Sequence, residues 1–199
     1  MKKIMFNDKY GLTQAVLEGR KTQTRRTFLK HGEENLLRRT FLKPGEETLL
    51  HGITPEYLII AKSRYKLGET VAIAQSYKDI HAEILREVGD LDLKNEFLQS
   101  KVYTNKMFVR AEKMPHTIRI TNIRVERLQD ISDEDCMKEG IWCDNNVGLK
   151  GTTYWYHGLA NSSFRTPQEA YASLIDRISG NGTWESNPYV FVYDFELID

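Results

Sequence analysis

The chain has 199 residues, of which 40% are hydrophobic and 28% charged, proportions typical of a folded globular protein rather than a disordered one. Its 28 Lys and Arg residues balance 28 Asp and Glu residues, which excludes a strong overall attraction to nucleic acid. No apolar run approaches the roughly 20 residues of a membrane-spanning helix, so we expect no membrane partner. The 5 histidines, Cys136 and Cys143 lack metal-ligand spacing, which predicts no metal and no cofactor.

The first ten residues, MKKIMFNDKY, begin with two lysines after the methionine, as a signal peptide does. Polar residues from Asn7 to Lys9 interrupt the segment before an apolar region forms, and this pattern favours a cytoplasmic protein. Nothing in the sequence predicts an oligomeric state.

The first half of the chain contains one strand, one helix and a long polar excursion. Residues 3–7 have strand character, and apolar residues between Leu12 and Val16 then recur at helical spacing until Gly19, which is suited to a left-handed helix cap. Residues 27–66 have no sustained period and read as an insertion. It contains most of a tandem duplication, in which RRTFLKHGEENLL (25–37) is followed by RRTFLKPGEETLL (38–50), with 11 of 13 positions identical.

The second half alternates short strands with short helices, which predicts an α+β chain with a small mixed barrel. Alternating apolar and polar residues mark the strands, and capping residues mark the helices. A proline and a capping box open the last helix, whose expected buried stripe is Ala170, Leu174, Ile175 and Ile178. The expected elements are a strand over 69–75, a helix over 79–88, a strand over 118–126 with a β-bulge at 121–122, a helix between Ser132 and Gly140, a helix that begins at Thr166, and a strand over 189–198.

A cluster of cations follows the first helix. Between residues 20 and 43 lie eight Lys and Arg side chains, against only Glu33 and Glu34. A cluster of this kind provides a local site for an anionic ligand in a chain without net charge. The alternative is a solvated charged loop.

Four segments together resemble the ASCH domain of the PUA-like superfamily, and more closely the ASCH proteins of phages and prophages. The segments are GRKTQTRR (19–26), KLGETVAIAQ (66–75), ITNIRVERLQDISDEDCMKEGI (120–141) and NPYVFVYDFELI (187–198). The resemblance implies one domain over 1–199, a small mixed β-barrel with flanking short helices, and a function in RNA binding. Long insertions at about 27–66, 78–110 and 143–165 have no counterpart in this pattern.

One bacterial branch of this family is an amidohydrolase that acts on N(4)-acetylcytidine, and its motif G-R-K-T-x-T-x-R is similar to residues 19–26. The resemblance implies that Lys21 is the proton acceptor, Thr24 the nucleophile and Glu139 the proton donor. We expect neighbouring residues of this segment to bind the substrate, RNA or a modified nucleoside. These are Arg20, Thr22, Arg25 and Arg26, of which Arg25 departs from the branch, where an apolar residue is usual.

Amide hydrolysis by such a triad makes definite physical demands. A lysine can deprotonate Thr24 only if burial or nearby cations lower its pKa. On a regular strand Lys21 and Thr24 would point to opposite faces, so a shared site requires a loop, which the cap at Gly19 predicts. Glu139 follows a helix, and the negative helix end there favours the protonated form that a donor requires.

Other interpretations remain open at the level of sequence. The chain is alternatively a noncatalytic module that binds RNA or a nucleotide, or a phage-associated accessory protein with a vestigial pocket. Tyr77 is a candidate stacking platform for a base and Arg119 a candidate RNA contact, although ordinary packing and solvation are the more common explanations for such residues. The aromatic residues at 154–156 are a candidate lid or part of the core.

The duplication generates a testable prediction. The second copy repeats RRTFLK but lacks the Gly-x-Lys-x-x-Thr pattern that precedes the first, so it contains no second reactive centre. We expect a variant that lacks residues 38–50 to retain its folding and ligand affinity. Circular dichroism and calorimetric titration check this, and collapse of the fold or loss of binding would refute it.

Overall fold

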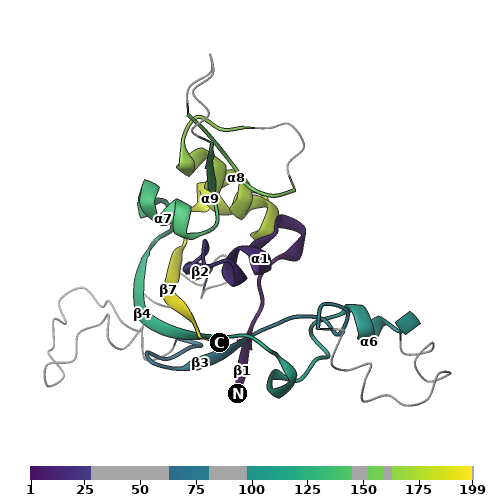
Figure 1. Cartoon of the computed structure of the whole chain (residues 1–199). Coiled ribbons are helices and arrows are strands. Elements are labelled where there is room, and N and C mark those ends of the chain that lie inside the picture. The colour runs from purple at the N-terminus through teal and green to yellow at the C-terminus, as the bar shows by residue number, and fades with distance from the viewer. Residues whose placement is uncertain (28–62, 81–97, 145–151, 159–162, 199) are drawn as a thin grey trace, which may run out of the picture.

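The computed structural model describes residues 1–27, 63–80, 98–144, 152–158 and 163–198, and Figure 1 shows how its elements are arranged. It has an α+β fold built around one five-stranded sheet, with a separate two-stranded hairpin. The strands are β1 (Lys2–Ile4), β2 (Gln23–Thr27), β3 (Thr70–Ile73), β4 (Thr117–Arg127), β5 (Trp142–Asp144), β6 (Thr153–Trp155) and β7 (Tyr189–Ile198). The sheet order is β1-β3-β4-β7-β2, and only the β1–β3 pair is parallel.

Short helices flank the sheet. In Figure 1, α7, α8 and α9 gather at one end of the long strands, and α6 lies apart from them beside the opposite end. The α-helices are α1 (Leu12–Leu17), α6 (Lys101–Thr104), α7 (Asp133–Lys138), α8 (Pro167–Ser179) and α9 (Thr183–Ser186), with 3₁₀ turns η1 (Asp8–Tyr10), η2 (Ala111–Lys113) and η3 (Leu128–Asp130). None of the helices in the described ranges is long and apolar enough to span a bilayer.

The long strands β4 and β7 form the spine of the sheet. They pair along their whole lengths, and the register shifts between Ile120 and Asn122. The β-bulge predicted from the change of phase is therefore confirmed, and β4 bends strongly in Figure 1, as a bulged strand does. Ile118 and Ile120 are fully buried on one side of the bulge, and β7 adds the buried Val192 to the same core.

Helix α8 covers this core as the capping pattern predicts. Thr166 accepts a hydrogen bond from the backbone N–H of Glu169, and Pro167 occupies the first turn. The helix buries Leu174 along its stripe, but Ile178 is 36% exposed, which corrects its expected burial. Ile178 lies in the last turn of the helix, at the rim of a cavity.

The predicted boundaries of the strands agree best with the structure where a strand pairs with a long neighbour, as β7 does with β4. The strand over 189–198 is confirmed, whereas the strands expected over 3–7 and 69–75 are shorter, at 2–4 and 70–73. Of the helix predicted over 79–88, residues 79–80 form a turn and the remainder lies outside the described residues. Residues 28–62, with most of the duplication, also lie outside them, as do parts of the other two insertions.

The predicted closed barrel is not found among the described strands. The sheet is open there, because β1 and β2 stand at its two edges and do not pair with each other. β1 has three residues, all paired with β3, and the one described strand that pairs with β2 is β7. The coarser α+β prediction is confirmed.

The aromatic run at 154–156 belongs to the hairpin and the core. Trp155 in β6 stacks on Trp142 in β5, with 4.8 Å between ring centroids. Tyr156 is fully buried, packs edge-on against Tyr10, and its hydroxyl lies 2.9 Å from Ser173 Oγ on α8. These contacts anchor the hairpin to the helix, so they support the core interpretation over the lid.

The packing of β4 predicts the effect of truncation in the core. Ile120→Ala removes buried methylene groups beside the bulge and should lower the free energy of unfolding by about 2–5 kcal/mol. Val102→Ala, at a 39% exposed valine on α6, is the control and should change it by under about 1 kcal/mol. Urea denaturation measures both, and equal effects would contradict the assigned core.

Candidate functional site

The turn after α1 aims Lys21 and Thr24 into one cavity. Gly19 adopts a left-handed φ of 70°, and the backbone N–H groups of Arg20 and Lys21 both donate to the carbonyl of Ala15 at 2.9 Å. Strand β2 starts only at Gln23, so Lys21 lies in the loop while Thr24 lies in the strand. The loop predicted from Gly19 is confirmed.

The cavity has a volume of about 300 Å³, at the small end of the range for ligand pockets. Its walls combine a charged side, contributed by β2 and the end of α7, with an apolar side from α1, α8 and the segment after β1. The polar lining residues include Lys21, Thr24, Arg25, Arg26 and Glu139, and the apolar lining residues include Phe6, Leu12, Leu174 and Ile175.

Lys21 is almost completely removed from solvent, with 1% of its side chain exposed. Its ammonium group donates to Glu139 Oε2 at 2.5 Å, to the Glu139 carbonyl at 2.8 Å and to the Gln23 carbonyl at 2.7 Å. Burial lowers the pKa of Lys21 below its ordinary value, and the charges of Arg26 and Arg25 act in the same direction, against the opposing effect of Glu139. The environment is therefore of the kind that a lysine base requires.

Glu139 is placed by the end of α7. Ser132 caps the start of this helix, and Gly140, with φ 102°, turns the chain immediately after Glu139. A Cβ atom at position 140 would lie 3.3 Å from the Leu12 side chain, so the glycine also permits close packing against α1. The Glu139 carboxylate lies between two cations, because Arg25 Nη1 contacts its other oxygen at 3.2 Å.

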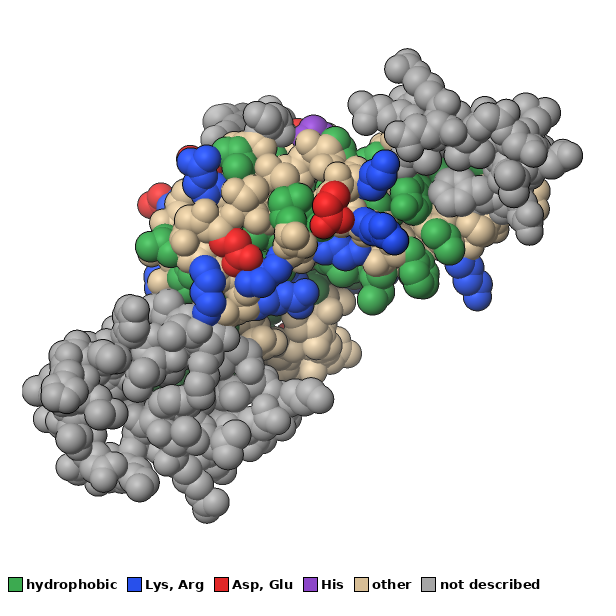
Figure 2. All heavy atoms as spheres, turned by 90° about the horizontal axis from the view of Figure 1, so that it is seen from below, with side chains coloured by type: hydrophobic (Ala, Val, Ile, Leu, Met, Phe, Trp, Pro, Cys, Tyr) green, Lys and Arg blue, Asp and Glu red, His purple; other side chains and the backbone are tan. Residues whose placement is uncertain are grey.

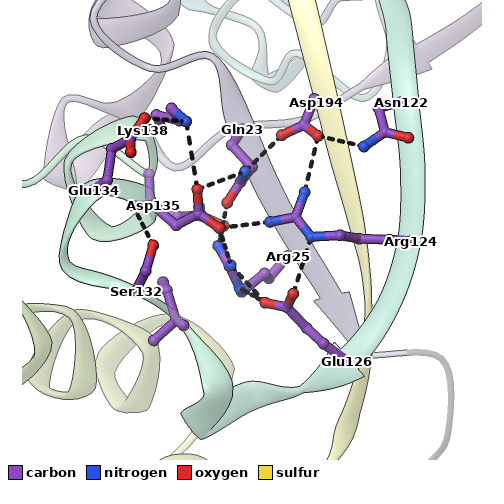
Figure 3. A network of polar contacts seen from close by, with 12 residues as sticks. Gln23, Arg25, Asn122, Arg124, Glu126, Ser132, Glu134, Asp135, Lys138 and Asp194 are labelled. Atoms are coloured by element: carbon purple, nitrogen blue, oxygen red, sulfur yellow. Dashed lines mark hydrogen bonds and ion pairs between the residues drawn. The ribbon is translucent and has the colours of Figure 1, made fainter.

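Arg25 connects this carboxylate to a larger ion-pair network, shown in Figure 3. Its side chain is 0% exposed, and its Nη2 lies 2.6 Å from Glu126 and 3.1 Å from Asp135. Arg124 reaches the same Asp135 at 2.5 Å and Asp194 at 2.9 Å. The network joins β2, β4, β7 and α7, and so fixes the helix that positions Glu139.

Asp135 lies at the centre of Figure 3, where Arg25 and Arg124 converge on one of its carboxylate oxygens. Burial opposes ionisation there, but hydrogen bonding to Arg25 and the charge of Arg124 outweigh it, so the pKa of Asp135 is lowered. The carboxylate therefore remains charged and holds both guanidinium groups in place.

Tyr171 is a polar lining residue that the sequence patterns did not single out. It belongs to α8, is 2% exposed, and its hydroxyl has no hydrogen-bond partner among the described residues. Burial raises the pKa of Tyr171 well above its ordinary value, which keeps the hydroxyl protonated. Tyr171 lies three and four residues before Leu174 and Ile175, a spacing that marks it as a core residue but not as a polar lining residue.

Two motif residues expected to bind substrate do not line this cavity. The Arg20 guanidinium stacks on Trp142 at 3.8 Å and pairs with Glu18 at 2.5 Å. Thr22 acts through its backbone, where its N–H donates to the Lys138 carbonyl and its carbonyl accepts from Phe195. Both residues stabilise the loop that presents Lys21.

The two candidates outside the motif are also placed elsewhere. Tyr77 packs against a small cluster that includes Ala72 and Val109. Arg119 lies on β4 with 52% of its side chain exposed and pairs with Glu196 at 3.4 Å. The structure therefore brings together Lys21, Thr24, Glu139 and two of the six residues expected to bind substrate.

The described residues show no metal-binding group, and the face drawn in Figure 2 carries charges of both signs. No cluster of three or more His, Cys, Asp or Glu side chains among them is arranged to hold an ion. Burial raises the pKa of the Cys136 thiol to about 12, so this cysteine is an inert core residue. Figure 2 shows Lys and Arg side chains spread over one face with acidic side chains among them.

Comparison of the chain with protein-family models, with curated proteins and with solved structures finds no match. The ASCH resemblance therefore stays a prediction from the motifs.

The network predicts unequal consequences for two arginines. Arg25→Met removes the fully buried guanidinium that Glu126, Asp135 and Glu139 share and should lower the free energy of unfolding by about 3–5 kcal/mol. Arg119→Met breaks one exposed pair and should cost about 1 kcal/mol or less. Urea denaturation of both variants tests this, and a small effect at Arg25 would contradict the structural role of the network.

Proposed function

We propose that this chain is an ASCH-type protein of the PUA-like superfamily that binds RNA or a modified nucleoside in the cavity and hydrolyses an acyl amide such as N(4)-acetylcytidine. One observation carries the proposal. A buried lysine and a buried glutamate share a 2.5 Å contact in the cavity that Thr24 also lines. These are the residue types that the amidohydrolase motif requires.

The Lys21–Glu139 contact supplies both an acid and a base through one proton. Transfer of that proton from the ammonium group to the carboxylate produces a neutral amine and a carboxylic acid. Burial opposes charge separation and so favours the neutral pair, in agreement with the lowered pKa of Lys21. In the proposed active state the pair holds one proton.

In the proposed reaction the Thr24 hydroxyl oxygen attacks the acyl carbon and its proton passes to the neutral Lys21 amine. The C–N bond then breaks, and the departing amine takes the proton of Glu139, which leaves an acyl ester on Thr24. Water hydrolyses this ester, releases the carboxylic acid and restores the Thr24 hydroxyl. Arg26 lines the cavity and provides positive charge for the carbonyl oxygen.

A noncatalytic binding module is the second candidate, and the contacts of Lys21 favour it. Its ammonium group already donates three hydrogen bonds, to Glu139 and Gln23, and within the described ranges none joins it to the Thr24 hydroxyl. An ammonium group held in this way anchors the loop of a binding cavity without chemistry. In that case Arg26, which also lines the cavity, supplies positive charge for RNA or a nucleotide.

Turnover separates the two candidates. Purified protein incubated with N(4)-acetylcytidine should release cytidine and acetate, as followed by chromatography. Lys21→Arg keeps the charge but removes the base, and Thr24→Val removes the nucleophile, so each should lower kcat/KM by about 100-fold or more. Arg119→Gln is the matched control and should retain activity. Absence of turnover between about pH 6 and 9 would exclude this substrate.

The pH profile tests the shared proton. Below the active range the pair binds a second proton and Lys21 is no longer a base, and above it the pair loses its only proton and Glu139 is no longer an acid. Because the pKa of Lys21 is lowered, the alkaline decline of kcat/KM should have its midpoint below 10.5. Initial rates corrected for uncatalysed hydrolysis measure it, and activity that rises through that pH would contradict the mechanism.

A further inference from the structure

A second cavity adjoins the candidate site. It has a volume of about 410 Å³ and shares with the first cavity a wall made of Met5, Arg26 and Thr27. Arg26 therefore faces a ligand in either space. The remaining lining residues come from β1, β7 and the segment before β3, and they are Lys3, Arg64, Tyr65, Phe191 and Tyr193.

Among the described residues, no carboxylate pairs with the cations that line the second cavity. Its described lining contains three cations, Lys3, Arg26 and Arg64, and no Asp or Glu. Lys3 donates to backbone carbonyls, among them that of Val109 at 2.7 Å, and Arg26 donates to the Met5 carbonyl at 2.5 Å. Neutral acceptors fix these side chains but leave their charge uncompensated.

Arg64 is the exposed cation of this set. Its guanidinium lies over the Tyr65 ring, 5.6 Å from the centroid, and it pairs with no carboxylate among the described residues. Arg119 provides the contrast, since it is also exposed but pairs with Glu196. An unpaired guanidinium has its donors available for an oxyanion, and phosphate accepts them in the same paired geometry as a carboxylate.

The aromatic residues form a closed floor rather than a stacking surface. Tyr65 and Tyr193 are 4% and 1% exposed and meet edge-on, with 5.3 Å between ring centroids. The Tyr65 hydroxyl is occupied as well, since it donates to the Lys3 carbonyl at 3.1 Å. A base has no open ring face to stack on, so the cavity selects its occupant by negative charge.

We propose that the second cavity binds the phosphate of a ligand whose base occupies the candidate site. This inference rests on the proposed function and specifies its substrate as a phosphorylated nucleoside rather than a free one. Arg64 and Arg26 contact the phosphate oxygens, and Arg26 separates the phosphate from the base. The phosphate belongs either to a mononucleotide or to an RNA chain.

Calorimetric titration with cytidine, cytidine 5′-monophosphate, cytidine 3′-monophosphate and a short oligocytidylate tests the proposal. At least one monophosphate or the oligonucleotide should bind about 10-fold more tightly than cytidine, which corresponds to one charge-assisted contact. This gain should shrink as salt is raised. A mononucleotide that matches the oligonucleotide identifies the free nucleotide as the ligand, whereas a tighter oligonucleotide identifies an RNA chain.

Substitutions assign the effect to the second cavity. Arg64→Gln should remove most of the 10-fold gain and leave cytidine affinity unchanged, and Arg64→Glu should weaken the phosphorylated ligands further. Arg119→Gln is the matched control, because it removes an exposed arginine outside both cavities. Thermal denaturation confirms that each variant is folded. Unchanged affinity of Arg64→Glu for every phosphorylated ligand would overturn the proposal.

The outcome is separable from that of the proposed reaction. If phosphorylated ligands bind more tightly through Arg64 but no turnover is found, phosphate binding in the second cavity is supported and the proposed hydrolysis is refuted. Turnover of N(4)-acetylcytidine without a preference for phosphorylated ligands overturns the second cavity and leaves the reaction standing.

Discussion

The buried carboxylate of Glu139, held between Lys21 and Arg25, is the contact on which the candidate site depends. It joins the end of α7 to the loop at Lys21, at 2.5 Å, and to β2 at Arg25, at 3.2 Å, both more than a hundred residues earlier in the chain. An isolated charge at such depth would be strongly disfavoured, so each partner is stable there only while the others remain. This mutual dependence fixes the cavity wall and gives Lys21 an environment in which its amine is readily neutral.

The two cavities differ in whether their cations pair with acidic side chains. In the candidate site the two buried cations are matched by acids, because Lys21 pairs with Glu139 and Arg25 pairs with Glu126, Asp135 and Glu139. Around the second cavity the contacts of the cations within the described ranges are to neutral carbonyls or to a ring, and these do not cancel their positive charge. The paired acids and cations of the candidate site suit proton transfer. The cations of the second cavity, which contact neutral groups, suit the binding of an anion. Arg26 lies in the wall that the two cavities share, so it is close to both the proposed reaction and the proposed anion site.

Local features of the fold could be predicted from the sequence, and long-range ones mostly could not. The bulge in β4, the full length of β7 and the caps at Ser132 and Thr166 follow from alternation and capping, which depend on neighbouring residues. Closure of a sheet into a barrel depends on whether its two edge strands pair, which neighbouring residues do not determine. The described strands form an open sheet. The contact between Lys21 and Glu139 could be predicted only from the resemblance of residues 19–26 to the amidohydrolase motif. The network through Asp135 and the buried Tyr171 hydroxyl left no periodic signal that distinguishes them from solvated or core residues.

The central claim is that the Lys21 amine shares its proton with Glu139 and loses it more readily than an ordinary lysine. Nuclear magnetic resonance of the side-chain nitrogen of Lys21, followed as pH is raised in uniformly labelled protein and assigned by comparison with Lys21→Arg, measures this directly. The account predicts deprotonation at a pH below the ordinary lysine value of 10.5. An amine that stays fully protonated through that pH would contradict it and reduce Lys21 to an anchor of the loop.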